Sequence, residues 1–201
     1  MPRKYSMDTR SAAVEETRNR IIEATMQLHD EQGISGTSMQ DIAERAGVAL
    51  ATVYRHFPTV DDLVPACGGR NLELNPPPTR AVFESLESGE ARIAALVKAL
   101  HANYARGVRT YDVGFAEAVA LPVVARFMDE FTNNIASLVA EAARPFRPDT
   151  QGLSLATGLC HFHVWRSLTQ AGLSSEEATQ SVVRLVCTSL TTATTKKRGG
   201  A

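Results

Sequence analysis

Three side chains that could hold an anion lie next to one another in the stretch GVALATVYRHF, residues 47–57. Tyr54, Arg55 and His56 follow one another there, and each carries a hydrogen-bond donor. Between Arg45 and Val60 the chain has no carboxylate, so a phosphate backbone would meet little repulsion along it. These residue types indicate binding of an anionic partner rather than catalysis.

These side chains need a scaffold, because the pattern predicts a helix only over Leu50–His56 and isolated helices below about 12 residues are marginal in water. An α-helix turns by about 100° per residue, so the direction of each side chain follows once Val53 faces a core. Ala49 and Phe57 then lie on the same side as Val53, and Ala51 and Arg55 point away from it. Thr52 and Tyr54 lie on the two flanks, and Leu50 and His56 lie at the borders of the core-facing side. A helix held from behind, with small residues in front and hydrogen-bonding residues at its sides, suits insertion into a DNA major groove.

Two predicted helices precede this one. The first covers about Ser11–Glu31 and ends at Gly33. The second is capped by Thr37 or Ser38, and its apolar residues recur at helical spacing up to Gly47. Three helices with a glycine-containing turn between the second and the third are typical of a helix-turn-helix.

A fourth helix is predicted after Thr59, which stands at capping-box spacing from Asp62. Pro65 falls inside this helix, where it removes a backbone hydrogen bond, and Gly68 and Gly69 follow soon after. The sequence therefore predicts a kink or a break in the fourth helix.

The run Asn75, Pro76, Pro77, Pro78 divides the chain, since the residue before each proline is pushed out of helical geometry. Beyond it the apolar spacing of three and four continues, without the period-two alternation of strands. Two of the further predicted helices include Ile93–Tyr104 and Val124–Leu138, and a third covers Thr150–Ala171. The last predicted helix begins at a Ser174–Glu177 capping box and ends at about Thr195, before a frayed tail KKRGGA. We therefore expect an all-α protein with an N-terminal three-helix helix-turn-helix domain (residues 1–58), a connecting helix and Pro-rich linker (59–78) and a larger C-terminal helical bundle domain (79–201).

The composition is that of an ordinary globular protein, with 44% apolar and 21% charged residues among 201. No apolar run approaches the roughly 20 residues that cross a bilayer, and the N-terminus lacks the apolar core of a signal peptide, so we expect a cytoplasmic protein with no membrane partner. The formal net charge of −1 gives no global sign of nucleic acid. Cys67, Cys160 and Cys187 are widely spaced and odd in number, which favours reduced thiols.

The segment GISGTSMQDIAERAGVALATVYRHFPTVDDL, residues 33–63, carries a family pattern. It resembles the N-terminal module of the TetR (tetracycline-repressor) family of bacterial transcription regulators, in which T-S/T-x-x-D/E-I-A is followed by A-G-V and by T-x-Y-x-x-F-P. The rest of the chain matches this family only in helical character and length. The matching residues are Thr37, Ser38, Asp41, Ile42, Ala43, Ala46, Gly47, Val48, Thr52, Tyr54, Phe57 and Pro58.

The resemblance implies DNA-binding roles for eight positions. Phosphate contacts are implied for Ser38, Thr52, Tyr54 and His56, and base-edge contacts for Gln40, Leu50, Ala51 and Arg55. Gln40 and Arg55 carry groups that read adenine and guanine edges. Leu50 and Ala51 offer only apolar contact, so we expect thymine methyl groups opposite them, although Leu50 could instead tuck into the edge of the core.

The chain lacks two lysines that are common in the family. Many members have Lys or another polar group where Leu50 stands, and a phosphate-binding Lys near Val60. This chain has neither, so its DNA affinity would be modest or would depend on Arg3, Lys4 and Arg10 in the N-terminal arm.

Aromatic and histidine side chains are the candidates for a small-molecule site, because an apolar pocket with a few polar groups would form between a DNA-binding head and a dimer interface. They also stand mostly at core spacing, so packing alone could explain each of them. The candidate ligand-binding residues are His101, Tyr104, Phe115, Phe127, Phe131, Phe162 and Trp165.

The sequence CHFH at residues 160–163 raises the question of a metal site. On one continuous helix His161 and His163 would lie about 200° apart and could not share an ion, although Cys160 and His163 could. No second cluster at ligand spacing accompanies them, so we expect no metal and no cofactor. We also find no paired carboxylates, Ser/His/Asp arrangement or Gly-rich phosphate loop, and therefore expect no catalytic residues and no enzyme.

The last two predicted helices are apolar enough to face more than their own core. In the family such a pair meets its symmetry mate, which implies a homodimer through the last two helices and, with two recognition helices, a pseudo-palindromic operator. The residues concerned are Leu155, Leu159, Phe162 and Arg166 on one helix, and Val182, Val183, Val186 and Leu190 on the other.

The sequence thus predicts a ligand-responsive transcriptional regulator, a repressor, that binds double-stranded DNA as a homodimer and is released by a small apolar or amphipathic effector. The effector need only bind better to a conformation whose heads are wrongly spaced. Three alternatives stay open: a constitutive or activating regulator without an effector, a helical enzyme or metal carrier using Cys160 and His163, and a protein-interaction module whose head no longer binds DNA.

Overall fold

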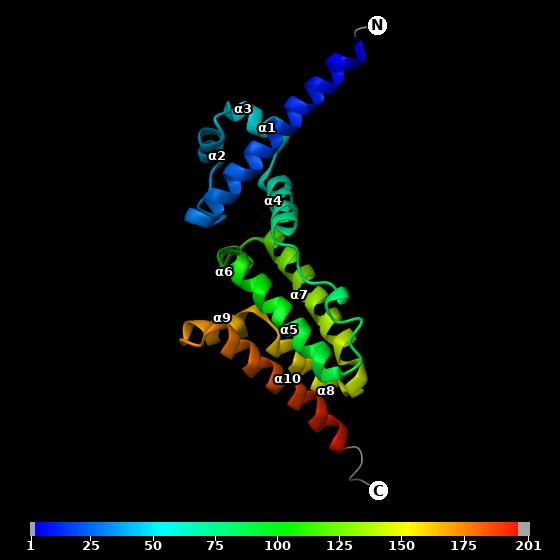
Figure 1. Ribbon diagram of the computed structural model, residues 1–201. Helices are drawn as coiled ribbons and strands as arrows, with labels where there is room; N and C mark the ends of the chain where they lie inside the picture. Colours follow the sequence, from blue (N-terminus) through cyan, green and yellow to red (C-terminus); the bar gives the residue numbers. More distant parts are fainter. Residues whose placement is uncertain (1–2, 197–201) are drawn as a thin grey trace. The chain divides into compact units, whose positions relative to one another are not determined.

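The computed structural model describes the backbone of residues 3–196 and the side chains of residues 11–191. Over this range the chain forms ten α-helices and two 3₁₀ helices and no strand (Figure 1), which confirms the all-α prediction. The side chains of Arg3, Lys4 and Arg10 and the predicted tail beyond residue 196 lie outside the described part. The elements are α1 (Arg3–Gln32), α2 (Met39–Ala46), α3 (Leu50–His56), α4 (Val60–Leu74), η1 (Arg80–Val82), α5 (Gly89–Arg106), α6 (Val108–Glu117), α7 (Pro122–Ala143), η2 (Arg144–Phe146), α8 (Thr150–Leu159), α9 (Phe162–Gln170) and α10 (Ser175–Lys196).

The chain packs as two units, and each is described by itself. The first combines Met1–Leu74 with Asp112–Met128, and the second combines Asn75–Tyr111 with Asp129–Ala201. The predicted functional domains, 1–58, 59–78 and 79–201, stay a prediction, because packing units need not coincide with functional domains.

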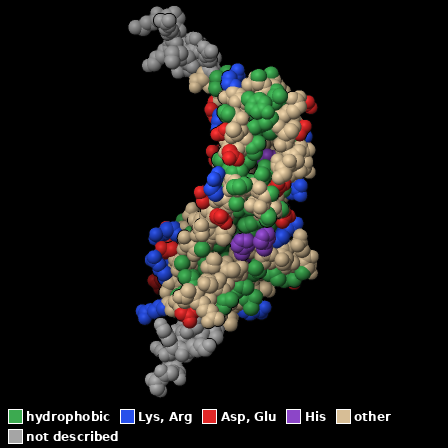
Figure 2. Space-filling model, turned by 180° about the vertical axis from the view of Figure 1, so that it is seen from behind, with side chains coloured by type: hydrophobic (Ala, Val, Ile, Leu, Met, Phe, Trp, Pro, Cys, Tyr) green, Lys and Arg blue, Asp and Glu red, His purple; other side chains and the backbone are tan. Residues whose placement is uncertain are grey.

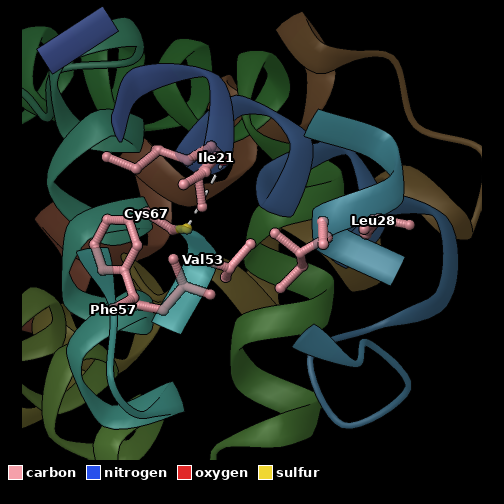
Figure 3. Packing of buried hydrophobic residues seen from close by; sticks show 9 residues of the cluster. Ile21, Leu28, Val53, Phe57 and Cys67 are labelled. Carbon is pink, nitrogen blue, oxygen red and sulfur yellow. Dashed lines mark hydrogen bonds between the residues drawn. The ribbon is translucent and has the colours of Figure 1, made fainter. Parts of the chain in front are cut away.

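One hydrophobic core holds the N-terminal helices together. Val53 of α3 and Phe57 just beyond it point toward Ile21 of α1 and Cys67 of α4 (Figure 3). Since α3 has only seven residues, this burial rather than its own propensity stabilises it. The buried members of this core are Ile21, Ile22, Leu28, Ile42, Ala43, Val53, Phe57, Leu63 and Cys67.

Helix α2 begins at a capping box on Ser38, which settles the choice between Thr37 and Ser38. The Ser38 hydroxyl accepts from the Asp41 N–H at 3.1 Å, while the Ser38 N–H donates to the Asp41 carboxylate at 3.1 Å. The Thr37 hydroxyl instead donates to the carbonyl of Gly33 at 2.7 Å. Two N-terminal amides of α2 are thereby satisfied without water.

Of the kink or break predicted in the fourth helix, the break is wrong, because α4 runs through Pro65 without interruption. Pro65 removes only the one N–H that would reach the carbonyl of Asp61, and its ring is exposed to solvent. The predicted cap is confirmed: the Thr59 N–H and hydroxyl donate to the Asp62 carboxylate at 3.1 and 2.7 Å. Later in α4, a Cβ on Gly68 would come within 2.6 Å of the Phe127 ring, so glycine serves close packing there.

In the second unit, α10 packs along α5 and α8. The predicted Ser174–Glu177 capping box starts α10, with the Ser174 N–H and hydroxyl donating to the Glu177 carboxylate at 2.9 and 2.7 Å. The central side chains of both long helices are fully buried or nearly so: Ile93, Leu96, Val97, Leu100 and Tyr104 on α5, and Ala178, Val182, Val186 and Leu190 on α10.

The predicted single helix over Thr150–Ala171 is also wrong, because the chain breaks between α8 and α9. His161 caps α9, and its Nδ1 accepts from the N–H of His163 at 3.3 Å. The hydroxyl of Tyr104 donates to the carbonyl of Cys160 at 2.8 Å, which satisfies a carbonyl at the break. The rings of His161 and His163 consequently lie next to each other, with centroids 5.1 Å apart, rather than about 200° apart on one helix.

Candidate nucleic-acid interface

The turn between α2 and α3 sets the direction in which α3 leaves the core. Gly47 ends α2 with φ 63° and ψ 41°, a left-handed conformation that glycine adopts without steric cost. The N–H of Val48 then donates to the carbonyl of Ala43 at 3.0 Å. Phe57 fixes the far end of α3, since its ring is buried and the Arg18 guanidinium lies 5.2 Å from the ring centroid.

This geometry divides the residues of α3 into a buried and an exposed side. Val53 has no exposed surface, whereas Ala51 and Arg55 are exposed and 48% of Tyr54 is accessible. Thr52 and His56 are half-buried, in keeping with positions at the flank and the border. The part of α3 that faces solvent therefore carries a small residue, a phenol and a guanidinium, the types that suit a DNA groove.

Leu50 lies differently from the other implied base-edge residues. Its side chain is half-buried and packs against the core of the N-terminal helices. This contact favours the interpretation that Leu50 tucks into the edge of the core.

The two implied DNA contacts on and before α2 are held by hydrogen bonds within that helix. The amide nitrogen of Gln40 donates one N–H to Glu44 at 2.8 Å, so its second N–H and its carbonyl oxygen are left for a partner. The hydroxyl of Ser38 donates to Asp41 at 2.7 Å, and this bond lowers the pKa of the Asp41 carboxyl. A phosphate at Ser38 must therefore compete with the Asp41 carboxylate.

The sequence suggested a surface without carboxylates between Arg45 and Val60, but the fold brings one there. Glu31 of α1 accepts two hydrogen bonds from the Arg45 guanidinium, at 2.9 and 2.7 Å. These bonds lower the pKa of Glu31 and raise that of Arg45. Arg45 thus contributes little net charge to the interface, which leaves Arg55 as the main cation of α3. Because Glu31 and Arg45 are 14 residues apart, no local sequence pattern predicted this pair.

Charged side chains elsewhere are mixed in sign. On the face drawn in Figure 2, acidic and basic side chains alternate between apolar patches. This mixture agrees with the formal net charge of −1. Attraction to DNA must therefore come from local groups rather than from a field of one sign.

Five of the seven candidate ligand residues come together in the second unit. Tyr104 is central: its ring centroid lies 5.5 Å from Phe162, 5.8 Å from Trp165 and 6.4 Å from Phe131. His101 joins through Trp165, with centroids 6.3 Å apart. Phe115 and Phe127 belong to the first unit instead. We refer to His101, Tyr104, Phe131, Phe162 and Trp165 as the aromatic cluster.

Sequence reasoning missed Tyr111, which lies against the aromatic cluster at 5.0 Å from Phe131 and 5.2 Å from Phe162. Its hydroxyl donates to Asn103 at 2.5 Å. Asn103 in turn donates to Asn75 at 3.0 Å and to the Pro76 carbonyl at 3.1 Å, which ties the proline run to α5. Burial raises the pKa of Tyr111 to about 12 and also raises that of Tyr104, so both phenols are neutral hydrogen-bond donors near pH 7.

Over the part of the chain that the structure describes, no group of three or more His, Cys, Asp or Glu is placed to hold a metal ion. Burial raises the pKa of the Cys160 thiol to about 12, which disfavours the thiolate that a metal requires. Within the same described residues, no helix is both long enough and apolar enough to cross a membrane.

Comparison with known proteins agrees with this geometry. Residues 21–67 match the model of the family described as bacterial regulatory proteins, tetR family. The HTH-type transcriptional repressor KstR of Mycolicibacterium smegmatis is 40% identical over 63 residues, 31% of this chain and 31% of that protein. The HTH-type transcriptional regulator SrpR of Pseudomonas putida is 36% identical over 94 residues, 45% of this chain and 43% of that protein. These matches span less than half the length of either relative.

Solved structures resemble the chain over most of its length. A transcriptional regulator from Rhodococcus sp. Rha1 aligns with a TM-score of 0.66 and 16% identity, over 88% of this chain and 97% of that one. The flavonoid-responsive regulator FrrA aligns with a TM-score of 0.59 and 24% identity, over 89% of this chain and 97% of that one. At these identities the likeness concerns the fold. With the head motif and the match at residues 21–67, the chain carries at its N-terminal end the helix-turn-helix domain of the bacterial tetR-family regulatory proteins.

Proposed function

We propose that the protein is a ligand-responsive transcriptional repressor that binds a pseudo-palindromic operator as a homodimer and leaves it when a small apolar or amphipathic effector binds. One observation carries the DNA-binding part: α3 is fixed to the core through Val53, while Ala51, Tyr54 and Arg55 face solvent. The relatives named as transcriptional repressors and regulators support the regulatory role. In this proposal the protein acts in the cytoplasm, where it binds DNA, and it is not an enzyme.

The side chains divide into those that position the head and those that read bases. Thr52, Tyr54 and His56 serve phosphates, together with Ser38 if Asp41 releases its hydroxyl. Arg55 reads guanine, which offers two acceptors to a guanidinium. Gln40 reads adenine, with its carbonyl oxygen accepting from the amino group and its remaining N–H donating to the ring nitrogen N7. Ala51 meets a thymine methyl group.

The dimer surface in this proposal keeps only some of the residues expected from the sequence. Phe162, Val182, Val186 and Leu190 have no exposed surface within their own protomer, so they cannot face a partner in this conformation. Of the other expected residues, Leu159, Arg166 and Val183 are half-buried, and Leu155 of α8 is 52% exposed. Helix α10 also exposes Leu185, at 50%. A homodimer through these two helices would cover both.

The dimer is tested by charge substitution. Leu155→Asp with Leu185→Asp should convert a dimer into a folded monomer in sedimentation at micromolar concentration, because a buried carboxylate would oppose association. Val119→Asp is the matched control, since Val119 is 92% exposed and lies outside both helices. A wild-type protein that sediments as a monomer would remove the dimer from the proposal.

The DNA-binding function is tested by selecting sites from random duplex DNA at a fixed physiological salt concentration. The proposal predicts an enriched pseudo-palindrome with thymines opposite Ala51. The selection is repeated with the double variant Tyr54→Phe with Arg55→Ala, which should lose the enrichment. Failure of the folded wild-type protein to enrich any sequence would contradict the proposal.

A further inference from the structure

The aromatic cluster and Tyr111 next to it satisfy part of their polar atoms by hydrogen bonds within the protein. The hydroxyl of Tyr104 donates to the Cys160 carbonyl, and that of the neighbouring Tyr111 donates to Asn103. Two atoms differ: among the described residues, neither His101 Nε2 nor Trp165 Nε1 has a hydrogen-bond partner. Both side chains are nearly sealed from solvent, with 2% of His101 and 4% of Trp165 exposed. Buried polar atoms in native proteins nearly always have a partner, so the pair needs an explanation.

The hydrogen bonds around His101 identify its tautomer. Its Nδ1 lies 2.8 Å from the hydroxyl oxygen of Thr179, and the single proton of that hydroxyl is donated to the Ser175 carbonyl at 2.7 Å. The Thr179 oxygen must therefore accept, so Nδ1 of His101 carries the proton. Burial lowers the pKa of His101 to about 4, and the ring is neutral near pH 7. Nε2 is consequently a bare acceptor.

Trp165 supplies the opposite half of the pair. An indole N–H can only donate, and the Trp165 ring lies beside the His101 ring, with centroids 6.3 Å apart. Two neighbouring rings thus offer one acceptor and one donor inside an apolar surround of Tyr104 and Phe162. Arg92 Nε, another buried nitrogen without a partner among the described residues, is a different case. Its guanidinium already binds the carbonyls of Leu86 and Glu141.

We propose that His101 and Trp165 are the polar anchor of the effector site, and that this site takes an uncharged apolar molecule bearing a hydroxyl group. The hydroxyl donates its proton to His101 Nε2 and accepts from the Trp165 N–H, while the apolar body of the molecule packs against the rings of the aromatic cluster. This inference rests on the proposed effector response and names the chemical class of the effector.

Other functional groups fit this pair less well. A ketone accepts from Trp165 but has no proton for His101 Nε2. A carboxylate has the same defect and also brings a charge into an apolar site, which is costly unless His101 takes up a proton. An ether likewise lacks a donor. Of these groups, only the hydroxyl both donates to His101 Nε2 and accepts from the Trp165 N–H.

The test compares three probes of one shape: 4-tert-butylcyclohexanol, 4-tert-butylcyclohexanone and 4-tert-butylcyclohexanecarboxylate. Trp165 is the single tryptophan of the chain, so its fluorescence reports binding at the anchor, after correction for the weak near-ultraviolet absorption of the ketone. We expect the alcohol to bind about tenfold more tightly than the ketone, because one buried hydrogen bond is lost with the ketone. Equal affinities, tighter binding of the carboxylate, or no binding of the alcohol would overturn the proposal.

Thr179→Val provides a second test that does not depend on deleting the anchor. Valine cannot accept from Nδ1, so His101 is free to carry its proton on Nε2 and becomes a donor. The preference should then move from the alcohol toward the ketone, whose oxygen can accept from both rings. Tyr111→Phe is the matched control, since its hydroxyl is already paired with Asn103, and the alcohol preference should remain. An unchanged preference in Thr179→Val would contradict the assigned tautomer.

Failure of this proposal and failure of the proposed function give different results. If the alcohol binds selectively but the protein still fully occupies the selected operator, the proposed His101–Trp165 anchor is supported and the proposed effector response is refuted. If an operator is selected but the alcohol and the ketone bind with equal affinity, the proposed DNA-binding regulator is supported and the proposed anchor is refuted. Calorimetry on Trp165→Phe, which keeps an aromatic ring but lacks the donor, should show the alcohol bound about tenfold more weakly.

Discussion

The conformation of Gly47 gives a sharp test of how the recognition helix is held. We consider Gly47→Ala, which adds one methyl group at a residue with φ 63° and ψ 41°. No atom lies within 4 Å of the position of that methyl group, so any effect comes from the backbone conformation and not from a clash. A left-handed conformation costs an L-residue about 1–2 kcal/mol. Alanine also reduces the freedom of the unfolded chain, which returns about 0.4–1 kcal/mol.

The net expectation is a loss of about 1 kcal/mol in the free energy of unfolding, or a fall of about 2–4 °C in the melting temperature of a chain of this size. Thermal unfolding followed by circular dichroism measures it. Gly69→Ala is the matched control: Gly69 lies inside α4 with open space around it, and alanine should raise stability by about 0.5–1 kcal/mol. If Gly47→Ala is as stable as the wild type or more stable, the left-handed turn between α2 and α3 is not the conformation in solution.

Two further predictions concern charge. His101 has a folded pKa of about 4, below its ordinary value of 6.5, so the unfolded chain takes up the proton first as the pH falls. Stability from this group is complete above about pH 6.5 and declines toward pH 4, by up to about 3 kcal/mol. Urea unfolding at several pH values should show this slope, and His101→Gln should reduce it; an equal slope in the variant would argue against a neutral buried histidine. Glu31→Gln removes the carboxylate that pairs with Arg45, so DNA affinity should rise and the salt slope of binding should steepen by about one unit. The isosteric control is Glu15→Gln, whose partner Arg18 lies at 3.8 Å in an exposed pair; a similar effect of both changes would refute a special role for Arg45.

Local rules predicted the head almost completely, and two helix caps outside it. The helices α2 and α3, the glycine turn and the Thr59 and Ser174 caps each depend on residues within a few positions of one another. The buried side of α3 followed from helical periodicity, because Val53 and Phe57 lie about 400° apart and thus face the same way.

The Pro65 error has a local cause, whereas the other errors arose where a distant contact decided the structure. Pro65 did not break α4, because its ring is exposed and only one backbone hydrogen bond is lost. The break at Cys160 and His161 depends on the hydroxyl of Tyr104, which comes from α5. Likewise, the Glu31–Arg45 pair and the Thr179–His101 bond join residues far apart in sequence, and no pattern within either segment indicates its partner.

The central claim is that the solvent-facing side of α3 recognises DNA. The most direct measurement is the affinity of the full chain for its selected duplex, compared between the wild type and Arg55→Ala at one salt concentration. Arg80→Ala is the control, since Arg80 lies outside the head and pairs with Glu84. We predict that Arg55→Ala weakens binding by about 10- to 100-fold, as expected when a bidentate base contact is lost, with an unchanged melting temperature. Wild-type affinity in a folded Arg55→Ala protein would contradict recognition through α3.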